Sequence, residues 1–203
     1  MIRGLLPVLG LLLAGCAAQG PTAAQIRAGL SPALLARAPG PVLLAEVPDA
    51  GLAATLERSG TRDGVETWRT AGNQTLSFRA GVLVATRGLG DDLMSADVSG
   101  TVAALQGRAP GAYPRLLSYL DGEDRTLLRA MSCTMSAPEP AVVQGIGTAF
   151  PTSLRRETCH TTGLSVTNRY WQDAGGTMRR AEQWIGPGLG MLVTERLTDH
   201  DHP

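Results

Sequence analysis

The sequence predicts a mostly β domain, an antiparallel barrel or sandwich of about nine or ten strands with one or two short helices. After Pro41, short runs of β-branched or alternating apolar residues recur at a spacing of about 8–12 residues. Clusters of Gly, Asp and Asn, which favour tight turns, separate these runs. Few segments are long enough for the helical crossovers that parallel strands need, so a parallel α/β fold is disfavoured.

The chain begins with a predicted export signal. Arg3 precedes an apolar run, residues 4–14, that is too short for a membrane span of about 20 residues but suits a signal peptide. The run ends in Leu13-Ala14-Gly15-Cys16, which resembles the bacterial lipobox. We therefore expect residues 1–15 to be removed and Cys16 to become the lipid-modified N-terminus. The alternative is an ordinary signal peptide with an incidental cysteine.

The residues after the lipobox indicate where the protein is held. Ala17 follows the cysteine, in place of the Asp that retains many lipoproteins in the inner membrane. We therefore expect a lipid anchor in the outer membrane, facing the periplasm. Residues 16–41, rich in Ala, Gly and Pro, are expected to be the lipidated Cys and a flexible tether, with a short helix near Ala23–Leu30. Residues 42–203 are expected to form a single mostly β periplasmic domain.

The candidate segments for these strands fall into two groups. The first group is Val42–Val47, Ala53–Arg58, Val65–Thr70, Thr75–Arg79 and Val82–Arg87. The second group is Arg115–Leu120, Thr126–Met135, Thr152–Thr162, Ser165–Gln172, Thr177–Ile185 and Met191–Leu197. Between the groups we expect short helices near Asp91–Met94 and Val98–Leu105. Residues 121–124 (Asp-Gly-Glu-Asp) have the composition of a hairpin turn.

Two cysteines, Cys133 and Cys159, remain in the mature domain. In an oxidising compartment such a pair most simply forms a disulfide. The alternative is a pair of free buried thiols. Neither residue belongs to a Cys-x-x-Cys motif, so the sequence gives no sign of a redox enzyme.

The charges and motifs argue against several classes of function. Basic and acidic residues number 18 each, without blocks of like charge, which argues against a nucleic-acid partner. The sequence contains neither a Gly-x-Ser-x-Gly elbow nor a His-Glu-x-x-His motif. His160 follows a cysteine, and His200 and His202 lie in a polar terminal tail, where a metal site is not expected. We predict no enzymatic activity, no metal and no cofactor.

The few aromatic residues allow two interpretations. Trp68, Tyr170, Trp171 and Trp184 all fall in expected strands and lie close to arginines in the sequence. Aromatic faces with Arg donors are typical of sugar-binding surfaces. The same residues at strand spacing more often form core and cross-strand pairs, which is the interpretation we favour.

Two sequence blocks resemble a known family. Residues 66–93 contain Trp68 in one strand, an apolar strand after it, and then Thr86-Arg87-Gly88-Leu89. This block resembles the YjbF/GfcB family of group 4 capsule polysaccharide lipoproteins. A second block is similar to the C-terminal signature of that family, although Ala181-Glu182 replaces a small hydroxyl residue there; its matching positions are Asn168, Trp171, Gln183, Trp184 and Pro187.

The resemblance extends over residues 41–197 and implies a function. It implies a mostly β lipoprotein that assists exopolysaccharide or capsule secretion beside an outer-membrane β-barrel partner, with the polysaccharide as a candidate ligand. It implies no catalytic residue. The motif positions would be either structural or part of a binding surface. The alternatives are a carbohydrate-active envelope enzyme and a structural lipoprotein with no glycan role.

Overall fold

The computed structural model describes residues 20–109, 111–120 and 125–199. Within them the chain forms thirteen strands in one sheet. The first six are β1 (Val42–Val47), β2 (Leu52–Arg62), β3 (Val65–Arg69), β4 (Thr75–Arg79), β5 (Val82–Arg87) and β6 (Leu93–Asp97). The others are β7 (Tyr113–Leu120), β8 (Thr126–Met135), β9 (Glu139–Gln144), β10 (Ala149–Thr161), β11 (Leu164–Gln172), β12 (Met178–Gly186) and β13 (Gly190–Arg196).

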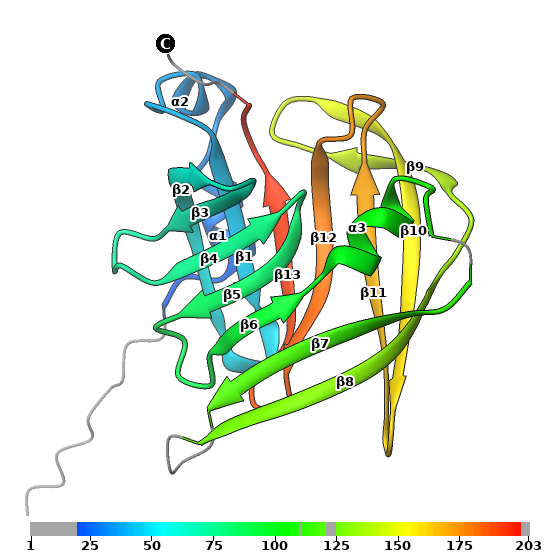
Figure 1. Cartoon of the computed structure of the whole chain (residues 1–203). Coiled ribbons are helices and arrows are strands. Elements are labelled where there is room, and N and C mark those ends of the chain that lie inside the picture. Colours follow the sequence, from blue (N-terminus) through cyan, green and yellow to red (C-terminus); the bar gives the residue numbers. More distant parts are fainter. Residues whose placement is uncertain (1–19, 110, 121–124, 200–203) are drawn as a thin grey trace, which may run out of the picture.

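The sheet curves into a nearly closed barrel (Figure 1). Its strand order is β5-β4-β3-β2-β1-β13-β12-β11-β10-β8-β7-β6, and β9 pairs with β10 outside this path. Neighbours are antiparallel throughout, as in the pairing of β1 with β2 and β13. The two ends of the path, β5 and β6, follow each other in the chain and lie in contact. The expected antiparallel, mostly β fold is therefore confirmed.

In the described part of the chain, the two edge strands of the sheet, β5 and β6, are joined by side-chain hydrogen bonds and not by a backbone ladder. The hydroxyl of Thr86 donates to Asp92 Oδ1 at 2.7 Å and accepts from the Leu93 amide at 3.0 Å. Asp92 Oδ2 also accepts from the Gly88 amide at 2.7 Å. The guanidinium of Arg87 donates to the carbonyls of Leu93 and Met94. Thr86 and Asp92 thus hold the seam between β5 and β6.

The thirteen strands exceed the expected nine or ten, and two of them, β6 and β9, lie where no strand was expected. Residues 93–97 form β6, although we expected a helix near Asp91–Met94; they pair with β7 at the edge of the sheet. Residues 139–144 form β9, a strand that we did not expect and that contains Pro140. A proline, which has no amide hydrogen, is tolerated there because β9 pairs on one side only, with β10.

The segment expected to be a flexible tether differs in its described part, from residue 20 onward. It contains α1 (Ala23–Ala28) and α2 (Pro32–Leu35), which pack on the outer face of the sheet. Their apolar residues cover β1 at Val42 and Leu44, so the outward positions of β1 are buried. An ion pair joins Arg27 Nη1 on α1 to Glu195 Oε1 at 2.6 Å. The outward apolar residues of β1 need a cover, and this segment supplies it.

Two further helical segments lie between strands. The 3₁₀ turn Pro48–Ala50 joins β1 to β2, and α3 (Ser99–Leu105) joins β6 to β7, where we expected a helix around Val98–Leu105. β7 and β8 pair up to Leu120 and Thr126, so they form the expected hairpin, although its turn, residues 121–124, lies outside the described residues.

Cys133 and Cys159 form a disulfide inside the barrel. They lie opposite each other on β8 and β10, and both are fully buried. The disulfide prediction is therefore confirmed over the alternative of free thiols. The bridge closes a sequence separation of 26 residues. On the chain-entropy model a loop of this length stabilises the fold by about 3.5 kcal/mol.

The signal peptide and Cys16 lie outside the described residues. Among the residues that are described, no helix has the length and apolar character needed to cross a membrane.

Candidate functional site

The barrel has two open ends, each surrounded by turns. At the upper end lie the turns at residues 63–64, 80–81 and 173–177, on the side of α2 in Figure 1. At the lower end lie the turns at residues 48–51, 70–74 and 186–190. A cleft opens at each end, and the two clefts differ in chemistry.

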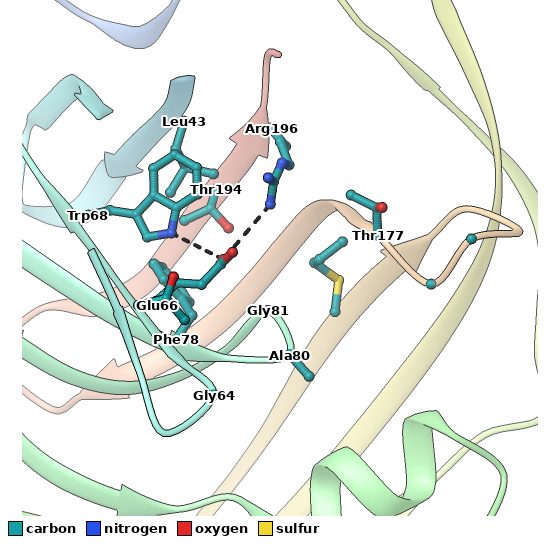
Figure 2. Close-up of a pocket in the computed structure, with 14 residues that line it drawn as sticks. Leu43, Gly64, Glu66, Trp68, Phe78, Ala80, Gly81, Thr177, Thr194 and Arg196 are labelled. Carbon is teal, nitrogen blue, oxygen red and sulfur yellow. Dashed lines mark hydrogen bonds and ion pairs between the residues drawn. The ribbon is translucent and has the colours of Figure 1, made fainter. Parts of the chain in front are cut away.

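The upper cleft has a volume of about 470 Å³ and mixes polar with apolar side chains (Figure 2). Leu43, Trp68 and Phe78, which are core residues, form part of its wall. Its polar lining consists of Glu66, Arg196, Thr61, Thr177 and Thr194. Among the described residues that line it, Glu66 is the single carboxylate.

Glu66 and Arg196 form a fixed polar pair in this cleft. Glu66 Oε2 accepts from Trp68 Nε1 at 3.4 Å and lies 3.8 Å from Arg196 Nη1. Its other oxygen, Oε1, accepts from Arg58 at 3.3 Å. The Arg196 guanidinium lies over the Trp68 ring, 5.3 Å from the ring centroid. Glu66 and Arg196 keep 28% and 16% of their side chains exposed, so both still face the cleft.

Small residues form the rim of the upper cleft. Gly64 and Gly81 have φ angles of +74° and +79°, which glycine adopts without strain. A Cβ atom on Gly81 would lie 2.5 Å from Met178 Cβ, so a side chain there would displace its neighbour. These turns were expected from the sequence, but their convergence on one cleft was not, because it depends on the curvature of the barrel.

The lower cleft, of about 330 Å³, is aliphatic. Its lining includes Gly88 and two residues, Thr70 and Gln74, whose side chains hydrogen-bond to each other. Glu46 is the remaining polar residue among the described residues of its lining. The other residues are Ala45, Val47, Leu52, Ala53, Ala54, Leu56, Leu76, Leu89 and Leu192.

The aromatic residues that we weighed as a sugar platform are mostly core. Trp68, Tyr170 and Trp184 are only 1%, 0% and 8% exposed, so their ring faces are covered. Trp171 is partly exposed and lies beside Arg180, whose guanidinium is 5.5 Å from the ring centroid. These residues therefore do not form a continuous aromatic surface.

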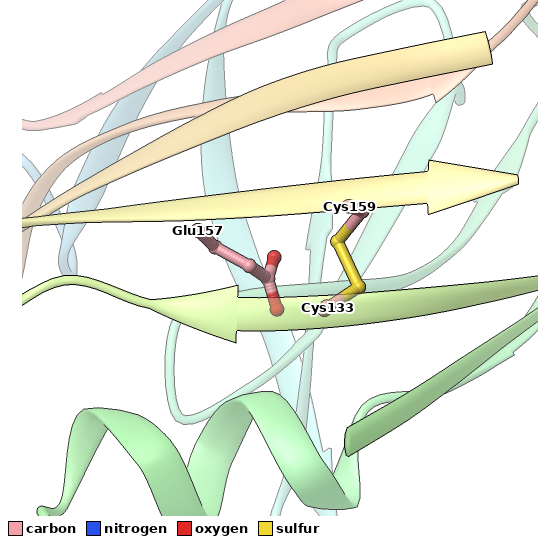
Figure 3. Close-up of side chains that lie close together, drawn as sticks. All are labelled: Cys133, Glu157 and Cys159. Carbon is pink, nitrogen blue, oxygen red and sulfur yellow. A yellow bond between two sulfur atoms is a disulfide. The ribbon is translucent and has the colours of Figure 1, made fainter. Parts of the chain in front are cut away.

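The interior of the barrel contains a polar cluster around Glu157, which the sequence analysis missed. The Glu157 carboxylate is fully buried on β10, next to the disulfide (Figure 3). It accepts hydrogen bonds from Thr101 Oγ1 (2.5 Å), Tyr113 OH (2.9 Å), Arg115 Nη1 (2.7 Å), Asn168 Nδ2 (2.7 Å) and Tyr170 OH (3.0 Å). These donors come from α3, β7 and β11, so the carboxylate joins four elements.

The electrostatics of this cluster keep Glu157 and Arg115 charged. Burial would raise the pKa of Glu157, but the charge of Arg115 and the hydrogen bonds lower it below its usual range. Burial likewise opposes the charge on Arg115. The hydrogen bonds and electrostatic attraction that Arg115 makes with Tyr170 and Glu157 outweigh this effect and raise the pKa of Arg115. Burial and the negative charge of Glu157 raise the pKa values of Tyr113 and Tyr170. Because Glu157 has no access to solvent, the arrangement suits structural support and not proton transfer to a substrate.

Three of the family-motif residues make interior hydrogen bonds. Asn168 donates to Glu157 and accepts from the Trp184 amide at 2.8 Å. Gln183 accepts from the Leu83 amide at 2.9 Å and donates to the Gly81 carbonyl at 3.1 Å, so it links β12 to the turn between β4 and β5. Thr86 is in the seam. Gly88 and Leu89 line the lower cleft, whereas Pro187 is exposed in the turn between β12 and β13.

Cys133, Glu157 and Cys159 are close enough for their ligand atoms to lie within 4.8 Å of one another (Figure 3). The two sulfur atoms are bonded to each other, and a disulfide offers no thiolate to a metal ion. His160 is exposed on β10, and His200 and His202 lie outside the described residues.

Comparisons with known proteins agree with this architecture. A family model described as group 4 capsule polysaccharide lipoprotein gfcB, YjbF matches residues 17–197. The crystal structure of the hypothetical lipoprotein YmcC from Escherichia coli K12 is similar, with a TM-score of 0.71, 18% identity, and coverage of 89% of this chain and 90% of that one. At this identity the likeness shows the fold alone.

A second solved structure, an exported protein with a YmcC-like fold from Bacteroides fragilis, gives a TM-score of 0.31 at 11% identity, covering 79% of this chain and 94% of that one. No curated protein matches the chain.

Proposed function

Because the chain belongs to the YjbF family of group 4 capsule polysaccharide lipoproteins, we propose that it is a non-catalytic accessory factor in capsule or exopolysaccharide secretion. In this proposal residues 1–15 are removed and Cys16 bears the lipid that holds residues 42–203, with the helices that cover them, in the periplasm. The anchor lies in the outer membrane, beside a β-barrel partner. Confinement to one membrane surface raises the effective concentration of the domain near the exit of the polymer.

The observation that supports a direct role with the polymer is the upper cleft. Its volume of about 470 Å³ lies within the range of about 300–1,000 Å³ that is typical of ligand pockets. A carboxylate, a guanidinium and threonine hydroxyls next to apolar walls match the alternating hydroxyl groups and CH faces of a sugar. We therefore propose that the upper cleft, and not an exposed aromatic surface, binds a segment of the polysaccharide.

The same cleft argues against a glycosidase. Such an enzyme needs two carboxyl groups about 5–10 Å apart across the sugar. Glu66 is the one carboxylate among the described lining residues, and its oxygens are already engaged by Trp68, Arg58 and Arg196. A binding role therefore fits the cleft better than hydrolysis.

Polysaccharide release by a deletion strain tests the accessory role. We expect less polymer in the medium, restored by the wild-type gene and not by Cys16→Ala. Unchanged polymer under conditions in which the strain makes it would contradict the proposal.

Titration of the purified lipoprotein with that polymer tests the cleft. We expect Thr177→Trp, which fills the upper cleft, to abolish binding, because Thr177 lines it. Thr162→Trp, at an exposed turn of the lower end, is the matched control and should bind as wild type does. Equal binding by the two variants would exclude the upper cleft.

A further inference from the structure

The lower cleft has a lining that suits one kind of ligand group. Its apolar side chains are all Ala, Val or Leu, and no aromatic residue is among the described residues that line it. Thr70 and Gln74 hydrogen-bond to each other, which leaves Glu46 as the one other polar side chain among the described residues of the lining. Binding there would depend on removing aliphatic surface from water, at about 25 cal/mol per Å². A flexible alkyl chain is the group that such a cleft accommodates best.

The strands that form this cleft also hold the N-terminal segment of the chain. β1 and β2 supply Ala45, Val47 and Leu56 to the wall of the cleft, and α1 packs on the same two strands from outside. The described chain starts at Gly20, four residues after Cys16. Four extended residues span at most about 14 Å. Four residues can therefore carry the acylated cysteine no further than this from Gly20, whose chain continues into the helix that packs on β1 and β2.

An acyl chain on Cys16 has the reach to enter this cleft. Half of a hydrocarbon core of about 30 Å corresponds to an acyl chain about 15 Å long. The six residues of β1, on whose outer face α1 packs, extend over about 20 Å between the upper cleft and the lower one. The peptide and the acyl chain together exceed this distance.

We propose that the lower cleft binds one acyl chain of the lipid on Cys16; this inference rests on the lipidation that is part of the proposed function. The other acyl chains stay in the bilayer and keep the protein anchored. Moving one chain from the bilayer into the cleft exchanges one apolar environment for another, so it costs little. It also removes the aliphatic lining of the cleft from water, which favours the bound state.

An acyl chain bound in the lower cleft would fix the orientation of the barrel on the membrane. With an acyl chain in the lower cleft, the lower end faces the membrane and the upper cleft, at the opposite end, faces away from it. A short peptide tether alone would let the domain rotate. The lipid thus places the proposed polysaccharide site toward the periplasmic space.

Photocrosslinking in the full lipoprotein, kept in membranes, tests the inference. Photo-leucine replaces Leu89 in the lower cleft or, as matched control, Leu43 in the upper cleft. After irradiation and digestion, mass spectrometry identifies what each position has labelled. We expect an adduct between position 89 and an acyl chain of the Cys16 lipopeptide, and no such adduct at position 43. Ala54→Phe, which narrows the lower cleft, should abolish the adduct while the circular dichroism stays unchanged.

The outcomes separate this inference from the proposed anchoring. Acylated Cys16 in the digest with no adduct at position 89, or with an adduct to a phospholipid there, would overturn the inference and leave the anchor intact. Equal labelling from position 43 would overturn it as well. Unacylated Cys16 in the digest would refute the anchoring itself.

Discussion

Glu157→Gln replaces the carboxylate at the centre of the interior cluster by an uncharged amide and should destabilise the whole barrel. The substitution leaves the shape of the side chain almost unchanged but removes the negative charge that faces Arg115 at 2.7 Å. Arg115 is 2% exposed, so water cannot solvate its charge in the folded protein. Breaking a buried ion pair by removing one partner costs about 3–5 kcal/mol, because an uncompensated charge stays buried.

Urea unfolding followed by circular dichroism measures this cost. A loss of about 3–5 kcal/mol corresponds to a fall in Tm of roughly 6–20 °C for a domain of this size. Glu139→Gln is the matched control, because Glu139 pairs with Arg156 at 2.6 Å on the surface. Surface pairs contribute little, so the control should unfold as wild type does. If both variants lose the same small stability, our account of the buried pair is refuted.

The dependence of stability on pH gives a second measure of the same group. The pKa of Glu157 is lower in the folded state than its usual value. The stability that it contributes is therefore fully present above the unfolded pKa of about 4.3 and is lost as the pH falls through the lowered folded value. In Glu157→Gln this part of the acid dependence should disappear. If the free energy of unfolding fell with the same slope in wild type and variant below pH ~4.3, Glu157 would not be the group responsible.

Three other variants test the remaining interactions that support the fold. Replacing Cys133 and Cys159 by Ala should lower stability by about 3.5 kcal/mol in urea unfolding, because the closed loop is lost; an unchanged midpoint would contradict the entropic argument. Thr86→Ala should cost about 1–3 kcal/mol and speed hydrogen exchange in β5 and β6 while β11 and β12 stay protected, since it opens the seam. Arg27→Ala should expose α1 to proteolysis, because Glu195, 3% exposed, loses its closer partner and keeps the more distant Arg180 at 3.8 Å; equal cleavage rates would show that apolar packing alone holds α1.

The sequence predicted the local features of the fold because these depend on neighbouring residues. Alternation of apolar and polar residues, with turn residues between, locates strands such as Thr75–Arg79, because successive side chains of a strand point to opposite faces. The hairpin between β7 and β8 follows from the same reasoning. β9 was missed; Pro140 argues against a strand there, and the sequence does not reveal that its pairing partner leaves one edge free.

A signal for Glu157 was present in the sequence but was not used. Glu157 precedes Cys159 by two residues, so both side chains lie on the same face of one strand, and a disulfide-bonded cysteine places that face inside. The partners of Glu157 could not have been inferred in this way. Thr101 and Arg115 are 56 and 42 residues away in the chain, and they meet Glu157 only after the sheet has curved.

The sequence by itself thus determined the resemblance to the family and the lipobox pattern, and it predicted the antiparallel strands and the pairing of the cysteines, all of which depend on short-range patterns or on a simple count. Tertiary structure alone decided the closure of the seam by Thr86, the cover that residues 20–41 place on β1, and the contrast between the two clefts. The physical reason is the range of the interactions. A pleat fixes which face a side chain takes, but only the order and curvature of the whole sheet decide which faces meet.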